Sequence, residues 1–307
     1  MKTNLTLTRN RRLRRVIVPP LAVAVLLWCA LPGCATKTAQ LPPLTTTPHS
    51  AWLPGKFVWA DLVTDDVATA RKFYGPLFGW TFRDYGKYVI AANDERPLAG
   101  LLQRPRPKDR EAKPRWIGYI SVPDVERAEG TVTNAGGRIL VPLQNVPGRG
   151  RQAVLADPEG AVFGVIKSSS GDPEDFLADP GDWIWIQLLS RDARRAADFY
   201  QAVGGYEVVE NTVTNHLSDY VLTSEGYARA TVRAIPEESA RVRPTWLPFV
   251  RVNNIYDSVA RARELGGEVL VVPKPGLLGG KVAVIADPSG AAIGLLEWSD
   301  DLMKGGH

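Results

Sequence analysis

The main constraint on the fold of this 307-residue chain is an internal repeat that covers most of its length. The segment Phe57–Leu62 (FVWADL) recurs 126 residues later as Trp183–Leu188 (WIWIQL). Further on, the turn sequence Asp157–Gly160 (DPEG) recurs 130 residues later as Asp287–Gly290 (DPSG). Each copy is long enough to bury a hydrophobic core of its own. The repeat therefore predicts two similar domains in tandem, at residues 57–168 and 183–298.

Residues 1–33 have the pattern of an export signal. They contain six basic residues and no acidic residue, followed by the apolar run Val16–Ala30. This run is shorter than the roughly 20 residues that a bilayer-spanning helix needs. The sequence Leu31–Cys34 (LPGC) that follows resembles a bacterial lipobox, which implies cleavage before Cys34 and acylation of that cysteine. A plain signal peptide and an uncleaved anchor are the alternatives.

The lipobox resemblance also implies a location. Ala35 follows the cysteine, as in lipoproteins sorted to the outer membrane, so we expect the protein to face the periplasm. The only other cysteine, Cys29, lies in the leader. The mature chain would therefore have no disulfide and no thiolate nucleophile.

The net charge of +4 comes from the leader. Beyond residue 33 the chain holds 31 basic and 33 acidic residues, so it lacks the excess of positive charge that nucleic-acid binding requires. This balance argues against nucleic acid as a partner.

Three segments outside the repeat are predicted to be connections. Residues 34–56 are rich in Thr and Pro and are interpreted as a semi-extended tether. Residues 169–182 form the interdomain linker, and residues 299–307 form a C-terminal tail.

Within the repeat, the apolar pattern predicts four units, each a strand, a helix and three short strands. A short polar residue precedes each predicted helix, where its side chain can cap the free backbone N–H groups. These capping residues are Asp65 or Asp66, Asp124, Asp192 and Asn254. The expected fold class is α+β with four βαβββ modules, two in each domain.

The strings FVWADLVTDDVATARKFYGPLFGW and LADPEGAVFGVIK, with their second copies, resemble the vicinal oxygen chelate superfamily of glyoxalases, bleomycin-resistance proteins and extradiol dioxygenases. The resemblance covers 57–168 and 183–298. It implies that the two βαβββ modules of each domain form a curved sheet around a cleft. In many relatives, His and Glu side chains hold a divalent metal there.

The resemblance also indicates where metal ligands would lie. Counted from the helix caps, these positions hold Trp59, Gly100, Ile117 and Lys167 in the first domain and Trp185, Thr231, Leu247 and Glu297 in the second. A catalytic metal normally takes about three protein ligands, and only Glu297 is well suited. His49, His216 and His307 fall elsewhere. We therefore expect no cofactor, and a metal-dependent enzyme is disfavoured.

Residues two apart on a strand share a face, so Trp59 and Asp61 should point together, as should Trp185 and Gln187. The predicted cleft residues are Trp59, Asp61, Tyr119 and Lys167 in the first domain and Trp185, Gln187, Phe249, Arg251 and Glu297 in the second. We hypothesise that Asp61 and Lys167 form an ion pair in place of a metal. The alternative is that the tryptophans belong to the core.

These observations favour an envelope-anchored protein that binds a small organic molecule in a metal-free cleft, as bleomycin-resistance proteins do. Its expected partners are that ligand and the membrane, and it would be a monomer or a homodimer. One alternative is a glyoxalase- or dioxygenase-like enzyme that uses Glu297. Another is a structural envelope lipoprotein without a ligand.

Overall fold

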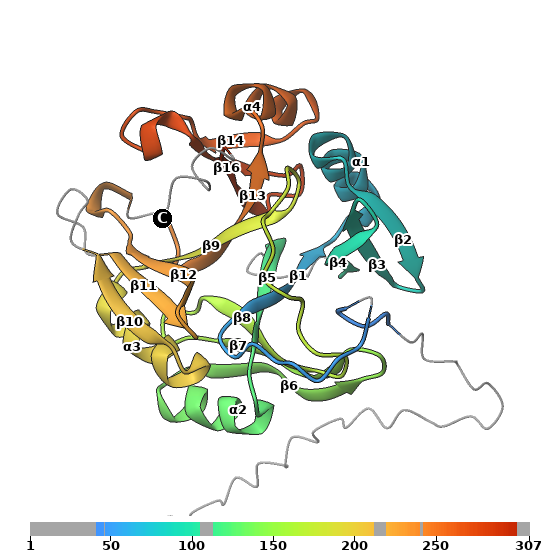
Figure 1. Ribbon diagram of the computed structural model, residues 1–307. Coiled ribbons are helices and arrows are strands. Elements are labelled where there is room, and N and C mark those ends of the chain that lie inside the picture. The colour runs from blue at the N-terminus through green and yellow to red at the C-terminus, as the bar shows by residue number, and fades with distance from the viewer. Residues whose placement is uncertain (1–40, 46, 105–112, 212–218, 240–241, 300–307) are drawn as a thin grey trace, which may run out of the picture. The chain divides into compact units, whose positions relative to one another are not determined.

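The computed structural model describes residues 41–45, 47–104, 113–211, 219–239 and 242–299 (Figure 1). All described residues belong to one compact unit, which lies within residues 39–307. No helix in the described ranges is long and apolar enough to cross a bilayer. The predicted leader, Cys34, His216 and His307 lie outside the described residues.

The first domain contains two modules with the same order of elements. The first comprises β1 (Phe57–Thr64), α1 (Val67–Phe78), β2 (Thr81–Tyr85), β3 (Tyr88–Asn93) and β4 (Arg96–Gln103). The second comprises β5 (Arg115–Ser121), α2 (Val125–Asn134), β6 (Arg138–Val146), β7 (Gly150–Ala156) and β8 (Val162–Ser168).

The second domain repeats this plan. Its first module comprises β9 (Trp183–Ser190), α3 (Ala193–Gly204), β10 (Glu207–Asn211), β11 (Asp219–Ser224) and β12 (Tyr227–Ala234). Its second comprises β13 (Thr245–Val252), α4 (Ile255–Glu264), β14 (Glu268–Val271), β15 (Val282–Ala286) and β16 (Ala292–Glu297), with short 3-10 turns at Glu237–Ser239 and Leu278–Gly280. The prediction of two tandem α+β domains, each of two βαβββ modules, is confirmed.

Each domain is built on one eight-stranded sheet. The order is β2-β3-β4-β1-β5-β8-β7-β6 in the first sheet and β10-β11-β12-β9-β13-β16-β15-β14 in the second. The two modules of a domain join through an antiparallel pair, β1 with β5 and β9 with β13. The first strand of each module runs parallel to its last strand, so each helix forms part of a crossover connection.

The predicted helix caps are confirmed. The side chains of Asp66, Asp124, Asp192 and Asn254 accept hydrogen bonds from backbone N–H groups in the first turns of α1 to α4. Gly79 ends α1 in a left-handed conformation (φ 78°), which a residue without a Cβ adopts at no steric cost. These local interactions explain why sequence patterns locate the helices well.

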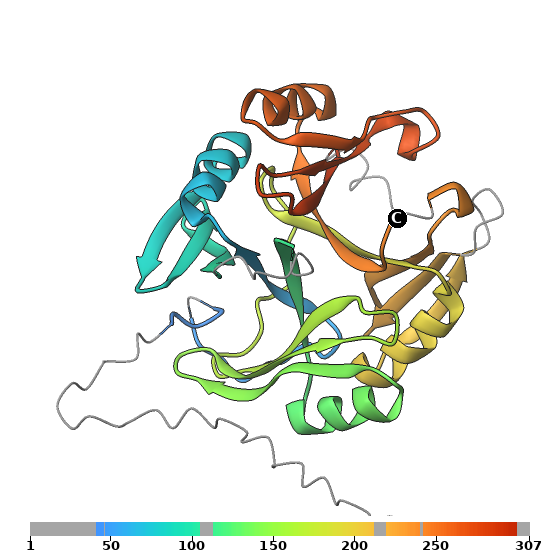
Figure 2. The same cartoon turned by 180° about the vertical axis from the view of Figure 1, so that it is seen from behind.

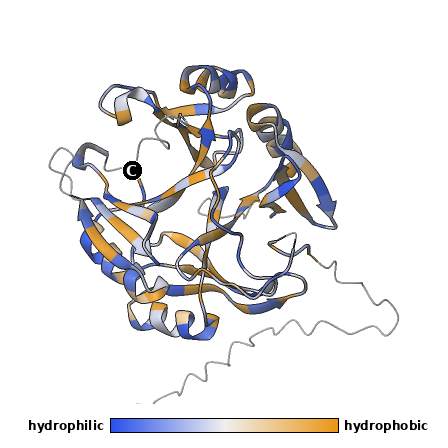
Figure 3. Cartoon of the chain, viewed as in Figure 1, coloured by the Kyte–Doolittle hydropathy of each residue, from blue (hydrophilic) through white to orange (hydrophobic). Residues whose placement is uncertain are grey.

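The two domains share their hydrophobic cores. One core joins α1 and its strands to α4, β15 and β16 of the second domain, and the other joins α2, β7 and β8 to α3 and its strands. Figures 1 and 2 show the corresponding helix pairs side by side, α1 with α4 and α2 with α3. Figure 3 shows that these helices carry both hydrophobic and hydrophilic residues. Because each core needs both domains, we expect them to unfold together.

Reciprocal hydrogen bonds link the domains inside these cores. The Tyr74 hydroxyl on α1 donates to Asp287 in the second domain (3.0 Å), and Tyr200 on α3 donates to Asp157 in the first (3.1 Å). Both acceptors belong to the repeated turn, which closes through hydrogen bonds from Gly160 N and Gly290 N. The repeated turn sequence thus also supplies contacts between domains, a role that the sequence alone did not indicate.

The described part of the predicted tether packs on the first domain and does not stand apart from it. Leu44 is buried with the side chains of the first sheet, and the indole N–H of Trp52 donates to the Ser168 carbonyl (3.0 Å). Leu53 N donates to Asp172 (2.7 Å), which anchors this segment to the interdomain linker. Composition suggested a free connection because it contains no information on such long-range contacts.

Candidate functional site

Each sheet has one face covered by helices and one face that carries a smaller cluster of side chains without helix residues, here called the helix-free face. In the first domain this cluster includes Trp59, Ile117, Tyr119 and Ile166. In the second it includes Leu247, Phe249 and Leu296, with Trp185 packed against them. These are the faces on which the family resemblance places its cleft.

The helix-free face of the first domain is organised around the buried carboxylate of Asp61. The indole N–H of Trp59 donates to this carboxylate (2.9 Å), and the Tyr88 hydroxyl also donates to it. Tyr119 also lies close enough to Asp61 for the charge of the carboxylate to act on its hydroxyl. Burial and the negative charge of Asp61 raise the pKa of both tyrosines well above the ordinary value, so they remain protonated donors. The prediction that Trp59 and Asp61 point together is confirmed.

Glycines make room for this arrangement. A Cβ on Gly100 would collide with the Tyr88 hydroxyl and the Asp61 carboxylate, and one on Gly164 would collide with the Tyr119 ring. Gly294 has the same relation to the ring of Phe249 in the second domain. The repeated glycines at 164 and 294 therefore reflect close approach of an aromatic ring on the neighbouring strand.

Arg149 and Leu44 cover the first helix-free face. The Arg149 guanidinium lies 3.8 Å from the centre of the Trp59 ring, and its Nε donates to the Pro42 carbonyl (3.0 Å). Arg149 is only 2% exposed and Leu44 only 4%. Side chains of the protein itself thus occupy the space that the family resemblance assigns to a ligand.

The second helix-free face has a neutral polar centre. The Trp185 indole N–H donates to the Thr231 hydroxyl (3.0 Å), and that hydroxyl donates to the Gln187 side chain (3.4 Å). Trp185 and Gln187 are half-buried, whereas Trp59 and Asp61 are buried. Of the two equivalent tryptophans, Trp185 therefore retains more contact with solvent.

The predicted positions of Lys167 and Glu297 are wrong. Lys167 is exposed, with its ammonium 5.7 Å from the centre of the Trp52 ring, and the described residues contain no Asp61–Lys167 ion pair. Glu297 accepts a hydrogen bond from Ile255 N at the start of α4 (3.0 Å). Ile166 and Leu296 occupy the helix-free faces instead. Since strand side chains alternate, a register error of one residue places a side chain on the opposite face.

A cavity of roughly 850 Å³ lies between the two domains. Four tryptophans line it, two of them at predicted site positions: Trp59, Trp183, Trp185 and Trp298. Arg251, a third predicted site residue, also lines the cavity and donates to the carbonyls of Trp298 (3.1 Å) and Ala178 (2.5 Å). The cavity lining does not include Asp61, Tyr119, Gln187 or Phe249 among the described residues.

Three of these tryptophans use their N–H groups within the protein. Trp59 donates to Asp61, Trp185 to Thr231, and Trp183 to the Leu98 carbonyl (2.9 Å). With the N–H groups engaged, these side chains contribute apolar ring surface to the cavity. The arrangement is suited to an organic molecule with apolar or aromatic surface.

Charged residues from both domains complete the cavity, and sequence reasoning missed them. They are Lys56, Arg96, Glu174, Asp175, Asp182 and Arg229. Several belong to the linker or to strand ends, where hydrophobic periodicity carries no information on what they contact. Tyr88 and Arg149 were missed for the same reason.

The ligand-equivalent positions do not fit a divalent metal of the kind the fold family implies. After correction of the register, they hold Trp59, Gly100, Ile117 and Ile166 in one domain and Trp185, Thr231, Leu247 and Leu296 in the other. Only the Thr231 hydroxyl offers a side-chain oxygen, and the residues described here contain no group of three His, Cys, Asp or Glu arranged to hold a metal.

Comparisons with known proteins agree with this fold. The model of the glyoxalase/bleomycin resistance protein/dioxygenase superfamily matches residues 56–165, and that of a glyoxalase-like domain matches residues 183–296. The chain is 31% identical over 260 residues to the anthracycline biosynthesis protein DauV of Streptomyces sp., covering 80% of this chain and 94% of that protein. This protein therefore belongs to the glyoxalase/bleomycin resistance protein/dioxygenase superfamily.

A second relative is CFP32 of Mycobacterium tuberculosis, which is named provisionally as a glyoxylase. It is 28% identical over 262 residues, covering 81% of this chain and 97% of that protein. Among solved structures, the Mn(II)-bound glyoxalase of Novosphingobium aromaticivorans has a TM-score of 0.54 at 14% identity, covering 80% of this chain and 82% of that one. The 2,2',3-trihydroxybiphenyl 1,2-dioxygenase of Sphingomonas wittichii has a TM-score of 0.53 at 15% identity, covering 81% and 91%. These two structures share the fold.

Proposed function

We propose that this protein binds a small organic molecule with aromatic surface, without a metal, in the cavity between its two domains. The observation that carries the proposal is the cavity of roughly 850 Å³ with four indole rings in its wall. Ligand sites of soluble proteins commonly have volumes of about 300–1,000 Å³, apolar walls and a few placed polar groups. This cavity has all three properties.

The contrast between the two helix-free faces supports the interdomain location. Arg149 and Leu44 cover the first face, so a ligand would have to displace both. Trp59 of the first face and Trp185 of the second face both line the interdomain cavity, but Trp185 is half-buried whereas Trp59 is buried. The proposed site therefore lies beside the family's usual cleft in the second domain and shares Trp185 with it.

The available groups favour binding over metal-dependent catalysis. The ligand-equivalent positions lack a suitable donor set, and Glu297, on which an enzyme alternative depended, accepts a hydrogen bond from Ile255 N at the start of α4 instead. Two relatives, DauV and DnrV, are named for anthracycline biosynthesis. Anthracyclines contain fused aromatic rings, so these names are compatible with an aromatic ligand.

A matched pair of tryptophan variants tests the proposal. Binding of 1-naphthylmethanol, a neutral aromatic probe, is measured by isothermal titration calorimetry with the full-length protein. We expect Trp185→Ala to weaken binding about tenfold or more, since burial of an aromatic surface contributes about 1.5–3 kcal/mol. Trp52→Ala serves as the control, because Trp52 is partly exposed and lies outside the cavity lining.

Two results would contradict the proposal. One is the absence of binding by a panel of aromatic compounds, which would favour a structural role for the protein. The other is stoichiometric Mn, Fe, Ni or Zn retained after dialysis and required for probe binding, which would favour a metal-dependent enzyme.

The proposed location is the outer membrane, facing the periplasm, with the protein anchored through acylated Cys34 as a monomer or homodimer. The sequence Leu31–Cys34 supports the anchor. We expect Cys34→Ser to abolish incorporation of labelled palmitate and to release the protein from the membrane fraction. Continued labelling of the variant would contradict acylation at this residue. Light scattering of the detergent-solubilised protein determines the oligomeric state.

A further inference from the structure

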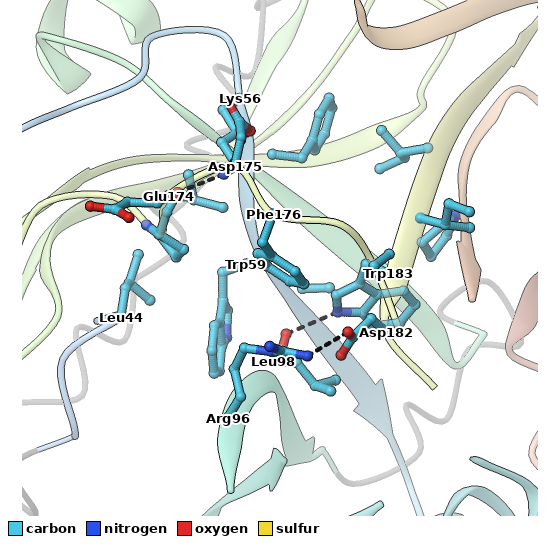
Figure 4. Close-up of a pocket in the computed structure, with 18 of the residues that line it drawn as sticks. Leu44, Lys56, Trp59, Arg96, Leu98, Glu174, Asp175, Phe176, Asp182 and Trp183 are labelled. Carbon is cyan, nitrogen blue, oxygen red and sulfur yellow. Dashed lines mark hydrogen bonds and ion pairs between the residues drawn. The ribbon is translucent and has the colours of Figure 1, made fainter. Parts of the chain in front are cut away.

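The linker between the domains passes along the interdomain cavity. Residues 173–178, here called the strap, all line it. Figure 4 labels three of them, Glu174, Asp175 and Phe176. Phe176 and Leu177 are about half exposed, at 51% and 50%. Two large apolar side chains on a connecting segment gain little from such partial burial. The strap is therefore held mainly by polar contacts.

The strongest of these contacts involve Asp175. Its carboxylate lies 2.9 Å from Lys56 Nζ in the first domain and 2.7 Å from Arg229 Nη1 in the second. The side chains of Lys56 and Arg229 are 14% and 6% exposed, whereas that of Asp175 is 38% exposed. The two cations thus belong to the cavity wall, and the strap carboxylate is their more solvent-accessible partner.

The pKa values agree with this arrangement. Burial lowers the pKa of Lys56, and the hydrogen bond and charge of Asp175 partly oppose that shift. Burial alone would raise the pKa of Asp175, but hydrogen bonds from Arg229 and Lys56 outweigh it and lower the pKa. A negative charge at this point therefore stabilises the Lys56 ammonium, which burial disfavours.

The residue after Asp175 adds an aromatic ring to the cavity lining. This residue is Phe176, and the Arg96 guanidinium lies 4.3 Å from the centre of its ring. Figure 4 shows Phe176 in the same cavity as Trp59 and Trp183. Asp175 and Phe176 together present a carboxylate and an aromatic ring to the cavity, as a small aromatic acid would.

The cavity lining has further donors to offer. Arg96 Nε, Arg229 Nε and Trp298 Nε1 are buried and lack a hydrogen-bond partner among the described residues. All three are donors, and a buried donor without a hydrogen-bond partner is unfavourable. A ligand that supplies acceptor oxygens would relieve this imbalance after a small shift of the lining side chains.

We infer that the cavity recognises an aromatic carboxylate, and that Asp175 and Phe176 of the strap occupy its position until such a ligand displaces them. Lys56 and Arg229 would bind the carboxylate of the ligand, and the indole rings would contact its aromatic part. This inference rests on the proposed function and adds the charge of the ligand and its competition with the strap. When the ligand displaces the strap, its carboxylate replaces that of Asp175 as the partner of Lys56 and Arg229. Because the strap is partly exposed, this exchange leaves both hydrophobic cores intact.

The test compares two probes of similar shape, 1-naphthoate and the neutral 1-naphthylmethanol. Isothermal titration calorimetry with the full-length protein measures the affinity of each. We expect Asp175→Asn to strengthen 1-naphthoate binding about tenfold, because the competing charge is removed, and to strengthen 1-naphthylmethanol binding by a smaller factor, because the neutral probe competes with Phe176 but not with the carboxylate. Arg229→Met should weaken 1-naphthoate binding about tenfold and leave the neutral probe within about twofold.

Asp179→Asn is the matched control. Asp179 is also an acid of the linker, but its side chain is 65% exposed and lies 3.6 Å from Arg96. We expect this variant to leave both affinities unchanged. Binding of the neutral probe to each variant also reports whether the cavity remains folded, so a loss of 1-naphthoate binding alone indicates a charge effect.

The outcomes separate this inference from the proposed function. If both probes bind equally and Asp175→Asn changes neither affinity, aromatic binding stands and recognition of a carboxylate is refuted. If Asp175→Asn weakens 1-naphthoate binding, the strap carboxylate supports the site and does not compete for it, which also refutes the inference. If neither probe binds the protein or any variant, both proposals fail.

Discussion

The hydrogen bond between Tyr200 and Asp157 provides a quantitative test of how the two domains are joined. Tyr200→Phe removes only the hydroxyl, which donates to Asp157 (3.1 Å) and accepts from the Trp246 indole N–H (2.8 Å). Tyr200, Trp246 and Asp157 are all buried, so water does not readily replace the lost partners. The variant therefore leaves an unpaired N–H and a carboxylate with one donor fewer.

The expected loss of stability follows from these two bonds. A hydrogen bond to a charged group contributes about 1.5–3 kcal/mol, and an unpaired buried donor costs about 1–3 kcal/mol. Since the two effects share one hydroxyl, we expect a combined loss of about 3 kcal/mol at pH 7. For a chain of this size, that lowers the melting temperature by about 6–12 °C. Because each core includes both domains, the loss should appear in a single unfolding transition.

The loss should also depend on pH. Burial raises the pKa of Asp157 above its ordinary value of 3.8, and the hydrogen bond from Tyr200 partly lowers it. The carboxyl group of Asp157 therefore has a higher pKa in the folded protein than in the unfolded chain. The resulting contribution to the free energy of unfolding is present at low pH and is lost as the pH rises through the folded-state pKa. Tyr200→Phe raises the pKa further, so its destabilisation is largest at neutral pH. It should decrease as the pH falls toward the ordinary value.

Thermal unfolding of the full-length protein, followed by tryptophan fluorescence between pH 7.5 and 4.5, measures both effects. Tyr206→Phe is the control, because the Tyr206 hydroxyl donates only to the Gly55 carbonyl (2.5 Å). We expect that variant to lose about 1 kcal/mol without a pH dependence in this range. A loss below about 1 kcal/mol for Tyr200→Phe, or a destabilisation that grows as the pH falls, would refute the reasoning.

Two further predictions concern residues at or near the predicted cleft. Glu297→Gln should leave the affinity for 1-naphthylmethanol unchanged and lower the free energy of unfolding by about 0.5 kcal/mol, because Glu297 interacts with the start of α4. Loss of probe binding in this variant would show that Glu297 belongs to the binding site. Arg149→Ala should lower the free energy of unfolding by about 2 kcal/mol, through loss of its contact with Trp59 and its bond to Pro42. Arg149→Met should lower the free energy of unfolding by less than about 1 kcal/mol, because methionine keeps the apolar contact and removes the unpaired Nη2 donor. Equal losses for the two variants, measured by urea unfolding, would contradict this account.

Much of the fold could be predicted because its determinants are local. Asp66, Asp124, Asp192 and Asn254 cap the four helices through bonds to residues within three positions of the cap. The spacing of apolar residues identified the strands and the buried helix faces. Glu297 shows the limit of this reasoning, since the repeat located its strand but did not determine which face it occupies. Its partner, Ile255 N, is 42 residues away.

The sequence by itself determined the two-domain architecture and the order of elements in each module, because residue type and spacing are sufficient for these. Only the tertiary structure decided where space for a ligand remains. Leu44 and Arg149 cover the centre of one sheet face, and the linker and both domains enclose a cavity beside it that Leu44 and Trp59 also line. Enclosure depends on contacts between segments that are far apart in the chain, and local patterns do not encode those distances.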